Sequence, residues 1–395
     1  MSSNREVVVV SGVRTAVGEF GGALKTFPAN QLAALVTREA VQRSGVDPAG
    51  FGHCVFGNVI HSEPRDMYIS RYAALEGGLP KEVPALTVNR LCGSGLQAIV
   101  SASQGILLGD YDTAVAGGAE SMSMAPHHVP SLRWGARMGD AQIVDAMVAA
   151  LHDPFHNCHM GVTAENIAEK WGISREDQDR AAADSHARAS HAIEAGHFAE
   201  QVLPVEVKTR KGTVVFDTDE HVRSDVDAAS MGALRPVFKK DGTVTAGNAS
   251  GINDAASAVV LMEAGSAERA GAEPMGRLVA YAHAGVEPEY MGIGPVPAIR
   301  MALEKAGIGV ADLDVIELNE AFAAQALAVI RDLGLPEDKT NPNGSGISIG
   351  HPIGATGCML TVKALYELRR TGGRYACVSM CIGGGQGIAA IFERL

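Results

Sequence analysis

Strand-like and helix-like segments alternate along this chain, and the alternation occurs twice. In the first copy, short apolar runs typical of β-strands are separated by longer segments with helical spacing, and Gly45, Gly77 and Gly109 follow the helices. Such alternation predicts an α/β fold in which helices pack on a sheet. The expected strands are 6–11, 53–58, 85–89 and 112–117, and the expected helices are 30–44, 66–76 and 93–108.

The second copy has the same plan, although few of its residues are identical to those of the first. Gly307, Gly334 and Gly372 end its helices, as glycine commonly does. The expected strands are 277–283, 314–318, 374–381 and 387–393, and the expected helices are 297–306, 320–333 and 354–371.

A long insertion interrupts the first copy. Its last strand is absent after Gly118, and AASAVVLMEA at 255–264 would supply it. We therefore expect an N-terminal half made of 1–120 with 251–275, an inserted loop domain at 121–250 and a C-terminal half at 276–395. The polar, irregular start of the insertion at 121–142 fits either an oligomer contact or a solvated loop.

Composition limits the function classes. A net charge of −12 argues against a general nucleic-acid or anionic-membrane surface. The N-terminal sequence MSSNREVVVVSG has no leader-like pattern, and we find no run of about eighteen apolar residues, so we expect a cytoplasmic protein. The six cysteines are widely spread and form no C-x-x-C pair, which predicts reduced thiols and no zinc site.

Three reactive residues stand beside glycines at expected element boundaries. They are Cys92 in VNRLCGSG, His351 in IGHPIGATG and Cys381 in MCIGGGQG. When the copies are aligned, Cys92 and His351 both precede a third helix, and Asn58 matches Asn319. Converging helix N-termini would favour a thiolate, and histidine could take its proton. Taken alone, Cys92 also fits a small buried residue at a tight turn, and the glycines after Cys381 fit an ordinary hairpin.

The whole chain resembles the thiolases, the acetyl-CoA C-acyltransferase family. VNRLCGSGLQA, NEAFAAQA, GHPIGATG and CIGGGQG resemble the four catalytic motifs of that family in order, and HMGVTAEN, TAGNASGIND and MGIGPVPA match its pocket segments. NPNGSGIS before the histidine motif is most similar to the broad-specificity β-ketothiolases of polyhydroxyalkanoate-producing bacteria.

The resemblance implies a fold and a reaction. The fold would be thiolase-like, with two pseudo-twofold-related βαβαβαββ halves, each with a mixed five-stranded sheet. The reaction would be a reversible Claisen condensation of acetyl-CoA with a short acyl-CoA. In it, His351 would activate Cys92, which accepts the acyl group, and Cys381 would deprotonate acetyl-CoA. One oxyanion would be held by His351 with a water on Asn319, and the other by the N–H groups of Cys92 and Gly383.

The resemblance also implies where coenzyme A binds, as substrate and product, with no separate cofactor or metal. Arg223 would meet the nucleotide phosphates, and Lys208, Arg210 and Lys211 fit this role and a solvated charge run about equally. The pocket residues carried over are Ser250, His159, Met160, Leu151, Phe238, Ala246, Met291, Ala321 and Phe322, of which Met160, Met291, Leu151 and Phe322 would shape the acyl pocket. The expected assembly is a homotetramer, a dimer of dimers.

Some alternatives remain. A decarboxylating ketoacyl synthase would share the fold and a cysteine nucleophile, but Asn319 and Cys381 disfavour it. A non-catalytic acyl-CoA-binding protein would be expected to lack Cys92, His351 or Cys381. Asn319 could also act as a helix N-cap before Glu320. Cys158 stands where relatives usually carry an aromatic residue, which would either loosen the pocket wall or be a local repacking.

Overall fold

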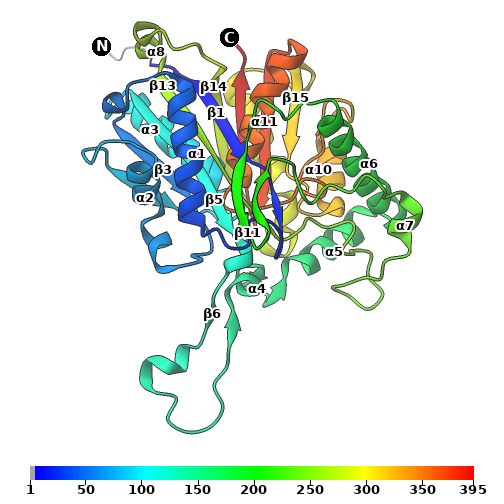
Figure 1. Cartoon of the computed structure of the whole chain (residues 1–395). Coiled ribbons are helices and arrows are strands. Elements are labelled where there is room, and N and C mark those ends of the chain that lie inside the picture. The colour runs from blue at the N-terminus through cyan, green and yellow to red at the C-terminus, as the bar shows by residue number, and fades with distance from the viewer. Residues whose placement is uncertain (1–4) are drawn as a thin grey trace.

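The computed structural model describes residues 5–395, and one large mixed sheet runs through both halves (Figure 1). The strand order is β4-β3-β5-β13-β1 in the N-terminal half and β14-β17-β16-β15 in the C-terminal half. The halves join where β1 pairs antiparallel with β14 at Val8 and Val9. These strands are β1 (Val7–Thr15), β3 (His53–Gly57), β4 (Ala85–Val88), β5 (Thr113–Ser121), β13 (Asn253–Glu263), β14 (Gly276–Gly285), β15 (Leu313–Leu318), β16 (Tyr375–Ile382) and β17 (Gln386–Glu393).

Strand directions repeat outward from that junction. In the N-terminal half, β13 is antiparallel to β1 and β5, and β3 is parallel to β5. In the C-terminal half, β17 is antiparallel to β14 and β16, and β15 is parallel to β16. The two halves therefore have the same topology, as the pseudo-twofold prediction requires.

One detail of the predicted sheets is wrong. The C-terminal half has four regular strands, and the position equivalent to β4 holds only an isolated bridge between Ile316 and Thr340. Asn341 and Gly344 follow with positive φ angles of 49° and 73°, so the chain turns away before a strand can extend. Hydrogen bonds between β1 and β14 also join the sheets of the two halves into one.

The predicted helices are present at nearly the expected positions. They are α1 (Ala29–Ser44), α2 (Ile69–Glu76), α3 (Ser94–Leu108), α9 (Pro295–Ala306), α10 (Ala323–Leu333) and α11 (Thr356–Thr371), with α8 (Ala264–Ala270) linking the halves. The start of α10 was expected at residue 320, but Glu320, Ala321 and Phe322 precede the helix.

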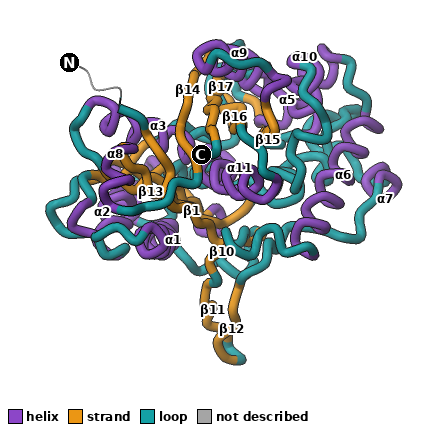
Figure 2. Tube along the Cα trace, turned by 90° about the horizontal axis from the view of Figure 1, so that it is seen from above, coloured by secondary structure: helices purple, strands orange, loops and turns teal. Residues whose placement is uncertain are grey.

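Alternating side chains place these helices in layers. On β1, Val8 and Val10 face the core shared with α1, whereas Val7 and Val9 face a central core that contains α3 and α11. A third core lies between the C-terminal strands and the helices α9 and α10. Figure 2 shows α11 between the strands of the two halves. The third helix of each copy, α3 in the first and α11 in the second, is thus buried at the centre of the molecule.

The segment Leu91–Leu108 corrects one sequence prediction, because it is long and apolar enough to span a membrane by length and composition. It contains α3, and 67% of it is buried inside the protein. Its place in the central core accounts for its apolar composition.

The segment between β5 and β13 forms elements that lie outside the main sheet, except β10, which pairs in parallel with β1. Two of its hairpins project from the body: β6–β7 in Figure 1 and β11–β12 in Figure 2. The elements are β6 (His127–His128), β7 (Val144–Asp145), α4 (Ala146–Ala150), β8 (His152–Asp153), β9 (Cys158–His159), α5 (Met160–Trp171), α6 (Arg175–Glu194), β10 (Val202–Leu203), β11 (Val205–Thr209), β12 (Gly212–Phe216) and α7 (Ala228–Gly232).

Candidate active site

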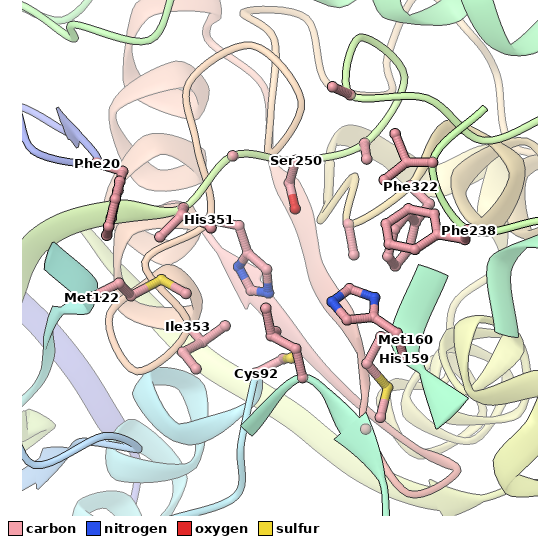
Figure 3. Close-up of a pocket in the computed structure, with 18 of the residues that line it drawn as sticks. Phe20, Cys92, Met122, His159, Met160, Phe238, Ser250, Phe322, His351 and Ile353 are labelled. Carbon is pink, nitrogen blue, oxygen red and sulfur yellow. The ribbon is translucent and has the colours of Figure 1, made fainter. Parts of the chain in front are cut away.

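A cavity of about 490 Å³ lies where the two halves meet the inserted segment (Figure 3). Most residues predicted for the site line it, although they come from segments far apart in the chain. Those residues are Cys92, Leu151, His159, Met160, Phe238, Ala246, Ser250, Met291, Ala321, Phe322, His351, Cys381 and Gly383.

Cys92 lies in a strained turn between β4 and α3. The preceding Leu91 has a φ angle of 45°, a conformation that a leucine rarely adopts, and Ser94 donates its N–H to the Leu91 carbonyl. Burial raises the pKa of the Cys92 thiol to about 11, although the N–H groups of Gly383 and of Cys92 itself favour the thiolate. The resting residue is therefore a neutral thiol that needs a base.

The first turns of α3 and α11 approach so closely that only glycine fits. A Cβ atom on Gly95 would lie 2.7 Å from the backbone nitrogen of Cys358, and one on Gly357 would lie 2.3 Å from that of Leu96. This contact brings the N-terminal ends of both helices together and places Cys92 and His351 beside the same cavity. The convergence predicted from the aligned copies is present.

His351 has a defined hydrogen-bonding partner that the sequence analysis missed. The Thr356 hydroxyl donates to the Pro352 carbonyl at 3.0 Å, so its oxygen accepts from His351 Nδ1 at 2.7 Å. Nδ1 therefore carries the proton, and Nε2 is unprotonated. Burial lowers the pKa of His351 to about 4, so the imidazole is neutral near pH 7. It is thus prepared to accept a proton.

Cys381 is the seventh residue of β16 and lies just before the glycine turn that leads to β17. Gly384 and Gly385 have φ angles of 80° and 82°, which the turn requires. Burial, followed by the nearby Cys92, raises the pKa of Cys381 well above its ordinary value. Both cysteines are free, as are the other four. The prediction of unpaired cysteines is therefore confirmed.

Asn319 follows β15 and lies next to the His351 ring. Its Nδ2 atom is 3.4 Å from both ring nitrogens of His351, and within residues 5–395 its buried Oδ1 atom has no hydrogen-bond partner. The alternative role as a helix cap is wrong, because α10 begins at Ala323 and has Phe322 at its N-cap position. The Asn319 amide thus contacts the His351 ring, although Asn319 itself does not line the cavity.

Aromatic side chains form one wall of the cavity. The His159 ring stacks on Phe238 with centroids 4.7 Å apart, and Phe238 meets Phe322 edge to face at 6.2 Å. His159 Nδ1 accepts from the Gly161 N–H at 3.0 Å, so in the neutral ring Nε2 is the donor. Ser250 lies on the same side of the cavity (Figure 3).

The predicted basic residues do not line the cavity. Arg223 is exposed, and its guanidinium lies 3.6 Å from Glu19, which does line it. Lys208 is on β11, and Arg210 and Lys211 form the turn of the β11–β12 hairpin.

Sequence reasoning missed part of the lining. Ile353 lies inside the recognised GHPIGATG segment, and both that segment and TAGNASGIND, which contains Thr245, Ala249, Gly251 and Ile252, offered a signal. The remaining lining residues stand in segments with no recognised pattern. The further lining residues are Glu19, Phe20, Met122, His221, Val237, Thr245, Ala249, Gly251, Ile252 and Ile353.

Family comparisons agree with this geometry. The thiolase N-terminal domain family matches residues 7–265, and the thiolase C-terminal domain family matches residues 272–394. The chain belongs to the thiolase family. The predicted family and the α/β thiolase fold are thereby confirmed.

Individual thiolases match over nearly their whole length. The chain is 67% identical to "Beta-ketothiolase BktB" of Cupriavidus necator, with 99% of this chain and 100% of the relative covered. It is 49% identical to an acetyl-CoA acetyltransferase of Chromobacterium violaceum, over 98% of this chain and 100% of the relative.

Solved thiolase structures have the same fold. The acetyl-CoA acetyltransferase of Bacillus anthracis superposes with a TM-score of 0.98 at 45% identity, covering 100% of each chain. Human mitochondrial 3-ketoacyl-CoA thiolase in complex with CoA gives 0.97 at 44% identity, covering 100% of this chain and 99% of that one.

Proposed function

We propose that this thiolase catalyses the reversible Claisen condensation of acetyl-CoA with acetyl-CoA or a short acyl-CoA, giving a 3-ketoacyl-CoA and free CoA. The observation that carries the proposal is the presence of two thiols and one neutral imidazole, Cys92, Cys381 and His351, around a single cavity. The similar proteins named beta-ketothiolase and acetyl-CoA acetyltransferase support these substrates for this chain.

In the first half-reaction, His351 Nε2 takes the proton of the Cys92 thiol as its sulfur attacks the thioester carbonyl carbon. A carbon–sulfur bond forms to Cys92, the bond to the CoA sulfur breaks, and CoA leaves as a thiolate while His351 holds the proton of Cys92. A thiol of pKa about 11 and an imidazole of pKa about 4 transfer the proton only as the attack proceeds, so no ion pair is stored in the resting site.

In the second half-reaction, Cys381 removes a proton from the methyl carbon of acetyl-CoA. The resulting carbanion attacks the acyl carbon on Cys92, a carbon–carbon bond forms, and the bond to the Cys92 sulfur breaks. The Cys92 thiolate then takes back its proton from His351. The base must be the Cys381 thiolate, although burial favours the thiol. We propose that its proton passes to the leaving CoA thiolate of the first step, which carries it away as the CoA thiol.

Two separate donor sets support the two oxyanions. His351 and a water on the unpartnered Oδ1 of Asn319 would serve the enolate, and the N–H groups of Cys92 and Gly383 would serve the tetrahedral intermediate. Asn319 makes a decarboxylating ketoacyl synthase the weaker candidate.

The pantetheine arm of CoA would lie along the wall formed by His159, Phe238 and Phe322, with Ser250 and His159 Nε2 as polar contacts. Ala246 and Ala321 would supply apolar surface beside it, and Leu151, Met160, Met291 and Phe322 would shape the acyl pocket. Arg223 would meet the nucleotide phosphates outside the cavity. A role for Lys208, Arg210 and Lys211 stays a prediction, as does a pocket effect of Cys158.

We also propose a role in polyhydroxyalkanoate or fatty-acid metabolism, a cytoplasmic location and a homotetrameric assembly. The similarity to "Beta-ketothiolase BktB" supports the metabolic role. The tetramer is supported by the projecting β6–β7 hairpin, where Leu132, Trp134 and Met138 are exposed. The division into an N-terminal half, an inserted domain and a C-terminal half remains a prediction.

A direct test measures CoA-dependent thiolysis of acetoacetyl-CoA by wild type, Cys92→Ala and Cys381→Ala. Wild type should be active, and both variants should lose at least about a thousandfold in kcat. Mass spectrometry after incubation with acetyl-CoA should find an acetyl adduct on Cys381→Ala and none on Cys92→Ala. Adduct formation on Cys92→Ala would contradict the assignment of the nucleophile.

A further inference from the structure

One buried side chain outside the cavity bonds to the chain on either side of Asn319. Asn341 lies in the segment between α10 and α11 that leads to His351, and it is 2% exposed. Its Oδ1 atom accepts from the Leu318 N–H at 2.8 Å, and its Nδ2 atom donates to Glu320 Oε1 at 2.9 Å. Asn341 thus holds both the residue before Asn319 and the residue after it.

The orientation of the Asn341 amide is fixed by its partners. The Leu318 N–H can only donate, so the amide oxygen must face it and the NH₂ group faces Glu320. A third bond ties the backbone, because the Asn341 N–H donates to the Ile316 carbonyl at 2.8 Å. Asn341 has a φ angle of 49°, which asparagine and aspartate tolerate better than most residues. The position therefore requires a short side chain with both a donor and an acceptor.

Two further residues of the same segment lie against Asn319. The Ser345 hydroxyl donates to the Leu318 carbonyl at 3.0 Å. A Cβ atom on Gly346 would lie 2.6 Å from Asn319 Oδ1 and 2.7 Å from the Glu320 carbonyl oxygen, so only glycine fits here. The segment therefore contacts the chain before, at and after Asn319.

The inserted segment supports this arrangement through α6. The Arg188 guanidinium donates to the Thr340 carbonyl at 2.7 Å, and the Ser185 hydroxyl donates to Glu320 Oε2 at 2.6 Å. The two carboxyl oxygens of Glu320 are thereby bonded, one to the insertion and one to Asn341. None of these residues lines the cavity, so they do not contact a substrate there.

The proposed role of Asn319 makes its exact place important. Its Oδ1 atom would hold the water that serves the enolate oxygen, and its Nδ2 atom lies 3.4 Å from both ring nitrogens of His351. A misplacement of about 1 Å in such a site lowers turnover by up to about a hundredfold. The place of Oδ1 depends on the backbone at Asn319, which the bonds of Asn341 fix.

We propose that Asn341 is a positioning residue for the enolate oxyanion site: by bonding to Leu318 and Glu320, it fixes Asn319 and the water that Asn319 holds. This inference rests on the proposed thiolase function. It assigns Asn341 to one half-reaction only, because the enolate forms when the carbon–carbon bond is made or broken and is absent from acyl transfer between CoA and Cys92.

Two assays on the same protein separate the half-reactions. Exchange of isotopically labelled CoA into acetyl-CoA requires only acyl transfer at Cys92, whereas thiolysis of acetoacetyl-CoA also requires the enolate. Asn341→Asp keeps the acceptor for Leu318 but turns an oxygen toward the carboxyl group of Glu320. The variant should lower kcat for thiolysis about 10- to 100-fold and leave the exchange rate within about threefold of wild type.

A rescue variant distinguishes positioning from general damage. Asn341→Asp combined with Glu320→Gln exchanges the donor and the acceptor between the two positions. The new carboxylate accepts from the Leu318 N–H and from the new amide NH₂, and the amide oxygen still accepts from the Ser185 hydroxyl. Thiolysis by this double variant should return to within about threefold of wild type.

Asn343→Asp is the matched control. Asn343 is buried in the same segment, and its Nδ2 atom donates to Glu367 Oε2 at 2.8 Å, so the variant creates a similar repulsion away from Asn319. Its ratio of thiolysis to exchange should stay within about twofold of wild type. The positioning role is refuted if Asn341→Asp lowers both rates equally or if the double variant recovers nothing. Wild-type protein without acetoacetyl-CoA thiolysis would instead refute the proposed function.

Discussion

At the scale of single residues, the site depends on which nitrogen of His351 carries a proton. Thr356 decides this, since its hydroxyl hydrogen is already given to Pro352 and its oxygen is left to accept from Nδ1. The GHPIGATG segment therefore contributes a base and also the group that fixes its tautomer. A hydrogen-bond partner on one ring nitrogen commonly controls the basicity of the other nitrogen in a catalytic histidine.

Thr356→Val should lower kcat about 10- to 100-fold, because an imidazole without its Nδ1 acceptor also populates the tautomer that has no lone pair on Nε2. The KM for acetoacetyl-CoA should change little, since Thr356 does not line the cavity. Steady-state thiolysis kinetics measure both values.

Thr356→Ser keeps the hydroxyl and is the matched control, which should recover most of kcat. A valine variant with wild-type kcat would mean that another contact fixes the tautomer.

At the scale of elements, two contacts hold the halves of the site together. The first is the crossing of α3 and α11, where Gly95 and Gly357 allow the backbones to touch. The second is Glu120 at the end of β5, a fully buried carboxyl group. It accepts from the N–H groups of Ile60 at 3.0 Å and Gly354 at 2.8 Å, and so ties the turn after β3 to the loop that carries His351.

Gly357→Ala should destabilise the protein by about 3 kcal/mol, because its methyl group would meet the backbone of α3 and force the two helices apart. Thermal unfolding gives the measurement. Gly232→Ala is the control, since a Cβ atom there meets nothing within 4 Å. Equal melting temperatures for the two variants would show that the helix crossing tolerates separation.

Glu120→Gln should lower kcat about tenfold and also lower the melting temperature, because an amide NH₂ would then face N–H donors that now bind a carboxyl oxygen. Asp66→Asn is a matched variant. Asp66 is a buried carboxylate that accepts from the N–H groups of Asn30 and Ser62, away from the cavity. It should lose stability and keep kcat, and an equal fall of kcat in both variants would exclude a positioning role for Glu120.

At the scale of the whole molecule, the inserted segment adds what the two halves lack. It supplies the wall of His159 and Phe238, and it extends the β6–β7 hairpin away from the body (Figure 1). Trp134 is 83% and Met138 98% exposed on this hairpin. Large apolar side chains gathered on a projecting arm are typical of a protein contact surface.

If the proposed tetramer forms through this hairpin, the double variant Trp134→Glu and Met138→Glu should halve the mass of the assembly, because charges at an apolar contact are not compensated. Analytical ultracentrifugation measures the mass. A tetramer that survives both substitutions would exclude the hairpin as its contact.

The sequence by itself determined the alternation of strands and helices in two copies, and it identified Cys92, His351, Cys381 and Asn319. Each of these signals is local, because hydrophobic periodicity and a motif are readable within about twenty residues. The predicted start of α10 at residue 320 and the possible role of Asn319 as a helix cap were wrong. The extended backbone before α10 continues through Phe322, and its length depends on contacts with residues distant in the sequence.

Tertiary structure alone decided the rest. Phe20, Met122 and Ile353 come from three separate segments and meet only after the halves and the insertion pack together. The fifth strand of the C-terminal half is reduced to the bridge at Thr340 for a similar reason: its pairing depends on the path the chain takes after Asn341. Contacts between residues distant in sequence follow from packing, and packing has no local signature in the chain.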